Sequence, residues 1–162
     1  MATVTFVPFS EVKPLSDCQP GDVVYSLRSK AEGPSLVVET NMPNMGQLIL
    51  LMPNGPVARE LPHDTLVMPY STQEYCIEVL GSVSPFVGVP EQNGALLHRD
   101  GNWQLLLQTS GTWECYDFRS GKFNARSGHQ EYICQNWRLI VPRLPVGATS
   151  DPKVIFERPA RA

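Results

Sequence analysis

The sequence has few charged residues for its length. Of its 162 residues, 18% are Asp, Glu, Lys or Arg, whereas about 25% is usual for a soluble domain. The 16 acidic residues outnumber the 13 basic ones, and the formal net charge is −3. A protein that binds nucleic acid broadly needs an excess of Lys and Arg to displace phosphate counterions. The composition therefore argues against general nucleic-acid binding.

The chain also lacks a long apolar run. Its longest strongly apolar stretch extends only from Leu48 to Met52, far short of the roughly 18 residues that span a bilayer. The N-terminal residues, which begin Met1-Ala2-Thr3, do not show the basic and then apolar pattern of a signal peptide. We therefore expect a cytoplasmic protein with no membrane partner.

Cysteine is scarce and unpatterned. The four cysteines are Cys18, Cys76, Cys115 and Cys134, and no two of them form a C-x-x-C pair. Zinc knuckles and thioredoxin-type redox sites are built on such pairs. In a reducing compartment we expect these thiols to be free and mostly buried.

Recognised motifs for catalysis and phosphate binding are missing as well. The sequence contains no G-x-S-x-G elbow, no G-x-x-x-x-G-K-[ST] loop and no G-x-G-x-x-G loop. The three histidines, His63, His98 and His129, have unrelated spacings that do not predict a metal site. We expect no cofactor and no enzyme activity. A hydrolase that uses His98 or His129 with a nearby acid is an alternative hypothesis.

The sequence does contain many short apolar or alternating segments, separated by Gly, Pro, Asn and Asp. This pattern is typical of short strands and tight turns, so we predict an all-β fold. In the first half the segments are 22–27, 35–40, 47–52, 57–61 and 65–69. In the second half they are 74–80, 103–109, 112–118, 122–125 and 137–142, with 153–157 as an additional edge strand.

The two series of segments resemble each other in order and punctuation. A Gly turn follows the third segment of each, at Asn54-Gly55 and Ser120-Gly121, and a Pro ends the fifth. We therefore predict an internal duplication, with two tandem five-stranded small barrels in residues 1–72 and 73–162. This order of strands resembles an SH3-like meander, and the likeness is one of fold alone.

Two insertions, at 81–102 and 126–136, distinguish the second half from the first. At most one short helix is expected, in the second insertion, where Ser127 and Gln130 have capping-box spacing. Extra loop length costs closure entropy and adds no core, so we expect it to serve binding. In an SH3-like barrel the two insertions lie side by side at one end. The residues expected there are Phe86, His98, Arg99, Asp100, His129, Glu131, Tyr132 and Trp137.

These features favour a non-enzymatic protein-binding module, of adaptor or inhibitor type, that acts through loops of the second half. The candidate residues at these loops include Trp, Tyr, His and Arg, and aromatic residues and Arg are enriched at binding hot spots. Another protein is the expected partner, although the insertions would alternatively serve only to join the two halves.

A second hypothesis is a small-molecule or nucleotide-binding module with a pocket between the halves. There, Arg99, Arg126 or Arg138 would hold a small anionic ligand. An exposed edge strand would also allow two copies of the chain to pair as a homodimer.

Overall fold

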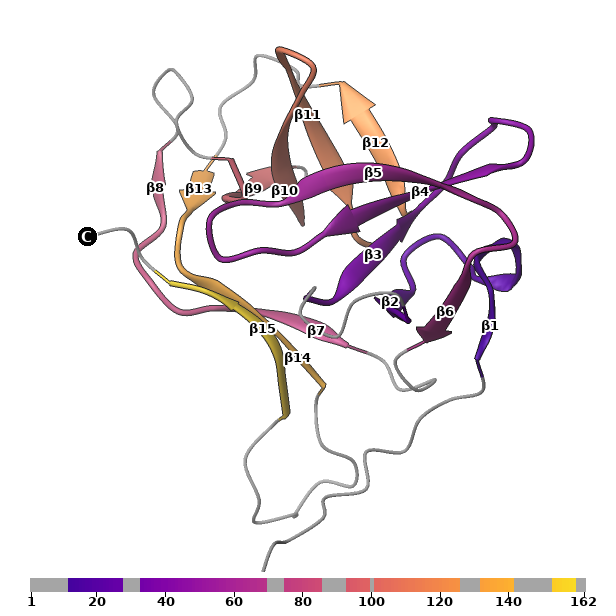
Figure 1. Cartoon of the computed structure of the whole chain (residues 1–162). Coiled ribbons are helices and arrows are strands. Elements are labelled where there is room, and N and C mark those ends of the chain that lie inside the picture. The colour runs from indigo at the N-terminus through magenta and orange to yellow at the C-terminus, as the bar shows by residue number, and fades with distance from the viewer. Residues whose placement is uncertain are drawn as a thin grey trace, which may run out of the picture.

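The computed structural model describes residues 12–27, 33–69, 75–85, 93–99, 101–125, 132–141 and 153–159 (Figure 1). Within these segments almost every regular element is an antiparallel β-strand, and the single helix is a 3-10 turn, η1 (Leu15–Asp17). The all-β prediction is confirmed. The described residues include no helix long and apolar enough to cross a membrane.

The first half forms one six-stranded sheet. Its strands are β1 (Lys13–Pro14), β2 (Val23–Ser26), β3 (Ser35–Val38), β4 (Met45–Leu50), β5 (Val57–Pro62) and β6 (Leu66–Pro69). Their order in the sheet is β1-β6-β2-β3-β4-β5. Strands β2 to β5 form a meander, and β6 then returns to pair with the free side of β2.

The second half divides its strands between two sheets. The strands are β7 (Cys76–Val79), β8 (Ser84–Pro85), β9 (Leu96–Arg99), β10 (Asn102–Thr109), β11 (Thr112–Asp117), β12 (Lys122–Ala125), β13 (Tyr132–Cys134), β14 (Trp137–Val141) and β15 (Lys153–Arg158). One sheet has the order β12-β11-β10-β9-β13-β8 and the other the order β15-β14-β7. Every sheet of the described chain has two edge strands, so none closes on itself.

All ten strands expected for the two halves are present, and β15 is the expected additional edge strand. The sequence-based prediction missed β8, β9 and β13, which lie inside the two insertions, and the two-residue β1. The short helix expected within 126–136 is not found in the described part of that insertion, where residues 132–134 are strand β13. Residues 126–131 lie outside the described part of the chain.

The main hydrophobic core is built by both halves together. From the first half it takes Val23, Leu36, Val38, Ile49 and Leu51. From the second half it takes Leu96, Leu105, Leu107, Tyr116, Cys134, Trp137, Leu139 and Phe156. Figure 1 shows the first-half strands lying against the strands of the second half. Since the burial of apolar surface is the dominant stabilising term in folding, the two halves stabilise each other.

Hydrogen bonds cross the same joint. The hydroxyl of Tyr116 donates to the Val37 carbonyl at 2.9 Å, and the hydroxyl of Tyr75 donates to the Gly21 carbonyl. The Glu39 amide donates to the Gly121 carbonyl at 2.7 Å. Gly121 adopts φ +68 and leaves no room for a side chain, because a Cβ there would lie 2.6 Å from the Gly21 nitrogen. The β11–β12 turn is thus fitted tightly against the first half.

The cysteines agree with the expectation of free thiols. None of the four is in a disulfide, and Cys18, Cys115 and Cys134 are buried while Cys76 is exposed. Burial raises the pKa of the Cys18 and Cys76 thiols, which disfavours the reactive thiolate.

Candidate functional site

The two insertions of the second half pair with each other. Strand β13, from the second insertion, lies between β9 and β8, which both come from the first insertion (Figure 1). In this ladder Tyr132 lies opposite His98 on one side and opposite Pro85 on the other. The two insertions are therefore joined to each other by strand pairing and are not separate loops.

Three ring-bearing side chains form a line across this part of the sheet. Trp103 on β10 lies opposite His98 on β9, which lies opposite Tyr132 on β13. Directly opposed residues of an antiparallel pair point to the same face. The His98 and Trp103 rings meet edge to face, with centroids 4.9 Å apart and an interplanar angle of 61°. We call Trp103, His98 and Tyr132 the aromatic row.

The aromatic row extends outward from the main core. Trp103 lies on the same face of β10 as the core residues Leu105 and Leu107, because every second side chain of a strand points to the same face. It is partly buried and packs against that core. His98 is half-buried, and Tyr132 is 52% exposed. The row therefore has a buried end at Trp103 and an accessible end at Tyr132, where Pro85 is also exposed.

The eight residues that the sequence predicted for the binding site separate in the structure. His98 and Tyr132 are brought together, and Arg99, next to His98 in the strand, is half-buried and faces the opposite side of the sheet. Phe86, Asp100, His129 and Glu131 lie outside the described residues.

Trp137, the eighth predicted residue, is completely buried. Its indole Nε1 donates to the Gly94 carbonyl at 2.9 Å, and its ring packs against Phe118 and Phe156. Trp137 is therefore a core residue and not part of an exposed binding surface. The sequence pattern could not show this, because the residues that surround Trp137 come from strands that are distant in the sequence.

Sequence reasoning overlooked Trp103 as a site residue. The signal for it was the dipeptide Asp100-Gly101, since Asp-Gly between apolar segments is a strong indicator of a two-residue hairpin. Arg99 pairs with Asn102 and His98 with Trp103, as such a hairpin requires, and Gly101 has φ +79. Recognising this turn would have predicted strand β9 and the contact between His98 and Trp103.

The first insertion also serves as a joint between the halves. The side-chain amide of Asn93 donates to the Pro56 carbonyl at 3.3 Å, and its oxygen accepts from the Gln108 amide at 3.1 Å. Asn93 of the first insertion therefore touches the first half, whereas His98 and Tyr132 belong to the aromatic row.

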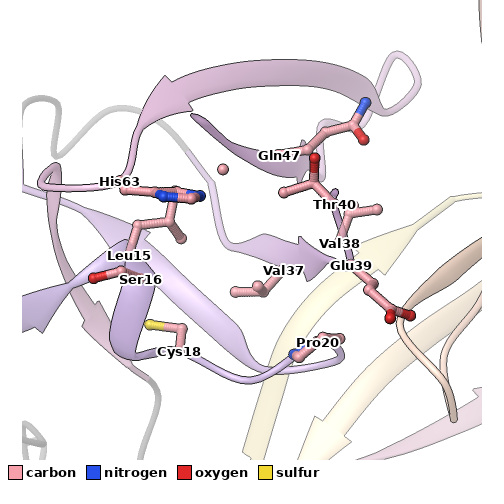
Figure 2. Close-up of a pocket in the computed structure, with 11 residues that line it drawn as sticks. Leu15, Ser16, Cys18, Pro20, Val37, Val38, Glu39, Thr40, Gln47 and His63 are labelled. Carbon is pink, nitrogen blue, oxygen red and sulfur yellow. The ribbon is translucent and has the colours of Figure 1, made fainter. Parts of the chain in front are cut away.

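A separate hollow of about 240 Å³ lies in the first half (Figure 2). It is lined by Leu15, Ser16, Cys18, Pro20, Val37, Val38, Glu39, Thr40, Gly46, Gln47 and His63. Its floor is apolar and its polar groups lie at the rim. Figure 2 shows the Glu39 carboxylate pointing away from Val37, and this carboxylate is paired with Lys122 at 2.7 Å. Every lining residue belongs to the first half, so the hollow does not lie between the halves.

Two of the groups proposed for the alternative functions, Arg138 and His98, contact neighbouring side chains, whereas Arg126 and His129 lie outside the described residues. Arg138 pairs with Glu78 across β14 and β7. His98 contacts the Trp103 ring, and no ion pair joins it to a carboxylate within the described residues. That part of the chain also holds no group of three or more His, Cys, Asp or Glu side chains that could bind a metal ion.

Comparison with known proteins finds no matching family model, no similar curated protein and no similar solved structure. The geometry of the chain itself is therefore the basis for assigning a function.

Proposed function

We propose that this chain is a non-enzymatic protein-binding module that acts through the aromatic row of its second half. The observation that carries the proposal is the pairing of the two insertions, which places an exposed Tyr132 beside His98, with Trp103 on the far side of His98. Tyr and Trp are the residue types that most often dominate binding energy at protein interfaces. Because they stand on strands rather than on free loops, little conformational entropy is lost when a partner binds.

The proposed role is that of an adaptor or inhibitor, with another protein as partner. A tyrosine that is 52% exposed at the end of a half-buried row offers apolar contact area together with a hydroxyl. This combination is typical of interface anchors. We also propose a cytoplasmic location, which the free thiols support because disulfides are rare in a reducing compartment.

The duplicated, SH3-like architecture with units 1–72 and 73–162 belongs to the same proposal. In the first half the five predicted strands are joined by the pairs β6-β2, β2-β3, β3-β4 and β4-β5. Three of these recur in the second half as β14-β7, β10-β11 and β11-β12. The shared core makes the two units interdependent parts of one fold.

The test is a pull-down from nuclease-treated native lysate, followed by reconstitution with the purified partner. The whole chain is compared with Tyr132→Ala and with Leu66→Ala, a matched control because Leu66 is 50% exposed in the first half. We expect Tyr132→Ala to weaken partner binding at least tenfold, about 1.4 kcal/mol, and Leu66→Ala to leave it unchanged. A partner bound equally by both variants would contradict the proposal.

The hollow supports a second candidate, the binding of a small molecule. Its apolar floor, with polar groups only at the rim, suits a small uncharged ligand better than an anion, because the one formal charge among its lining residues is the Glu39 carboxylate. A melting-temperature screen against uncharged metabolites and nucleotides tests this candidate, since a ligand of the native state raises its stability. If no compound raises the melting temperature, the small-molecule candidate is excluded.

A further inference from the structure

The hollow of the first half has free hydrogen-bonding groups at its rim. Gln47 on β4 and His63, which follows β5, are both half-buried there, and Figure 2 shows them on opposite sides of the hollow. Within the described residues, no hydrogen bond engages either side chain. The Thr40 hydroxyl, by contrast, accepts from the Met42 amide at 3.1 Å. A ligand in the hollow can therefore form hydrogen bonds with Gln47 and His63 without breaking existing ones.

The size of the hollow limits what can occupy it. Its volume of about 240 Å³ exceeds the roughly 150 Å³ of an apolar cavity that binds benzene. It is smaller than the roughly 300 Å³ at which sites for drug-sized ligands begin. The buried side chains of Leu15, Cys18 and Val37 form an apolar floor. A molecule of one or two rings that carries a polar group therefore matches both the volume and the lining.

The lining also favours an uncharged ligand. Glu39 is the only Asp, Glu, Lys or Arg among the lining residues, and its carboxylate is paired with Lys122 of the second half at 2.7 Å. A charged ligand would lose hydration on the apolar floor without gaining an unpaired opposite charge, which is costly.

One wall of the hollow is held in place by the second half. The Val37 carbonyl accepts from the Tyr116 hydroxyl at 2.9 Å, and the Glu39 amide donates to the Gly121 carbonyl at 2.7 Å. Val37 and Glu39 both line the hollow, and so does Pro20, which lies against Gly121 of the β11–β12 turn. Undocking of this turn would therefore release the backbone that forms the wall.

We propose that the hollow binds an uncharged molecule of one or two rings with a hydrogen-bonding group, and that this binding is coupled to the docking of the β11–β12 turn. A ligand that contacts the wall in its docked position binds the docked form more tightly, and by linkage it disfavours undocking. The turn belongs to the sheet that carries the aromatic row, so a ligand of the first half stabilises a sheet of the second. The inference rests on the small-molecule candidate and not on the protein-binding proposal.

The ligand class is tested by NMR titration of the full chain with benzamide and indole as neutral probes. Benzoate is the charged match of benzamide and should bind at least tenfold more weakly. Gln47→Ala should weaken benzamide binding at least threefold, whereas Gln108→Ala, a change at an exposed position outside the hollow, should leave it unchanged. Benzoate binding as tight as that of benzamide would overturn the ligand class. If neither neutral probe binds, the inference falls, and the melting-temperature screen still decides the small-molecule candidate.

The coupling is tested with two glycine variants. Gly121→Ala disturbs the docked turn, whereas the new Cβ in Gly111→Ala meets nothing within 4 Å. Gly121→Ala should weaken benzamide binding by about fivefold or more, the lower end of typical coupling between sites. Gly111→Ala should bind benzamide as the parent does. Equal affinities in the two variants would overturn the coupling and leave the small-molecule candidate standing.

Hydrogen exchange in the parent chain gives a second measure that does not depend on the folding of a variant. The Glu39 amide exchanges only when its bond to the Gly121 carbonyl opens. At about ten times the dissociation constant of benzamide, this exchange should slow about fourfold, as a fivefold weaker affinity of the undocked form requires. The control is the Gly55 amide, which donates to the Met52 carbonyl in the β4–β5 turn and should exchange at its original rate. Equal slowing at the two amides would overturn the coupling.

Discussion

The two halves share three of their strand pairings and differ in how the first and second predicted strands are joined. In the first half, β2 and β3 pair directly. In the second half, β7 and β10 lie in different sheets, and β10 pairs instead with β9, which pairs with β13. The insertions are therefore not loops attached to a closed barrel, because their strands belong to the same sheet as β10. They supply the strands β8, β9 and β13, and two residues of the aromatic row, His98 and Tyr132, lie on β9 and β13.

This comparison shows which residues of the aromatic row come from strands that the first half lacks. Segments with counterparts in both halves, such as β3 and β10, contribute Leu36 and Leu105 to the shared core. Segments present only in the second half contribute Tyr132 and His98 to the row. The added strands β9 and β13 also contribute Leu96 and Cys134 to the shared core, so they form part of the surface and part of the core.

The largest effect should come from the shared core. Leu36→Ala in the first half and Leu105→Ala in the second remove completely buried side chains, and each should cost about 2–5 kcal/mol. All three tryptophans lie in the second half. If the core is common, Leu36→Ala will still shift the unfolding transition monitored by tryptophan fluorescence. An unchanged fluorescence transition, with a second transition in circular dichroism, would show that the halves unfold separately.

The next effect concerns the tight fit of the β11–β12 turn. Gly121→Ala would place a methyl group against Pro20 and the Gly21 nitrogen, at a residue whose φ is +68. We expect a loss of about 2–4 kcal/mol in urea unfolding, from overpacking together with backbone strain. Gly111→Ala is the matched control, because φ there is +86 but nothing lies within 4 Å of the new Cβ. Equal losses of unfolding free energy in the two variants would mean that the contact of the β11–β12 turn with the first half contributes nothing to stability.

A smaller effect should appear at alkaline pH. Burial raises the pKa of Tyr75 to about 12 from its ordinary value of 10, and burial also raises the pKa of Tyr116. The unfolded chain releases these protons first, so the stability they contribute is complete below pH 10 and declines as the pH rises towards 12. The decline should approach about 1.4 kcal/mol per pH unit for each tyrosine. Urea midpoints between pH 9 and 12 measure it, and Tyr75→Phe should reduce the slope. An identical slope in that variant would refute the assignment.

The smallest effect is expected for the ion pair across the joint. Lys122 and Glu39 are 2.7 Å apart, but their side chains are 56% and 38% exposed. Pairs of this kind contribute about 0–1 kcal/mol. A double-mutant cycle with Lys122→Met and Glu39→Gln should give a coupling in this range that decreases in high salt. A coupling well above it would mean that charge pairing, rather than the shared core, holds the halves together.

The sequence was informative wherever a structural feature is local. Alternation and turn residues predicted the long strands and the Gly turns, because both depend on neighbours in the chain. The missed strands β8 and β13 have two and three residues, too few to show a period. The burial of Trp137 depends on Gly94, Phe118 and Phe156, and the hollow combines η1 with the ends of distant strands. Such features follow from tertiary packing, which no local pattern records.

The shared core has a consequence for the order of events during synthesis. The first half leaves the ribosome while Leu105, Tyr116, Trp137 and Phe156, which complete its core, are still untranslated or inside the exit tunnel. Because contacts between residues far apart in the sequence form late, we expect Leu36 and Ile49 to remain exposed until most of the chain has emerged. Phe156, near the C-terminal end of the described chain, is among the last residues needed. We therefore expect the side of the first half that faces the shared core to gain its stability only after the second half has emerged.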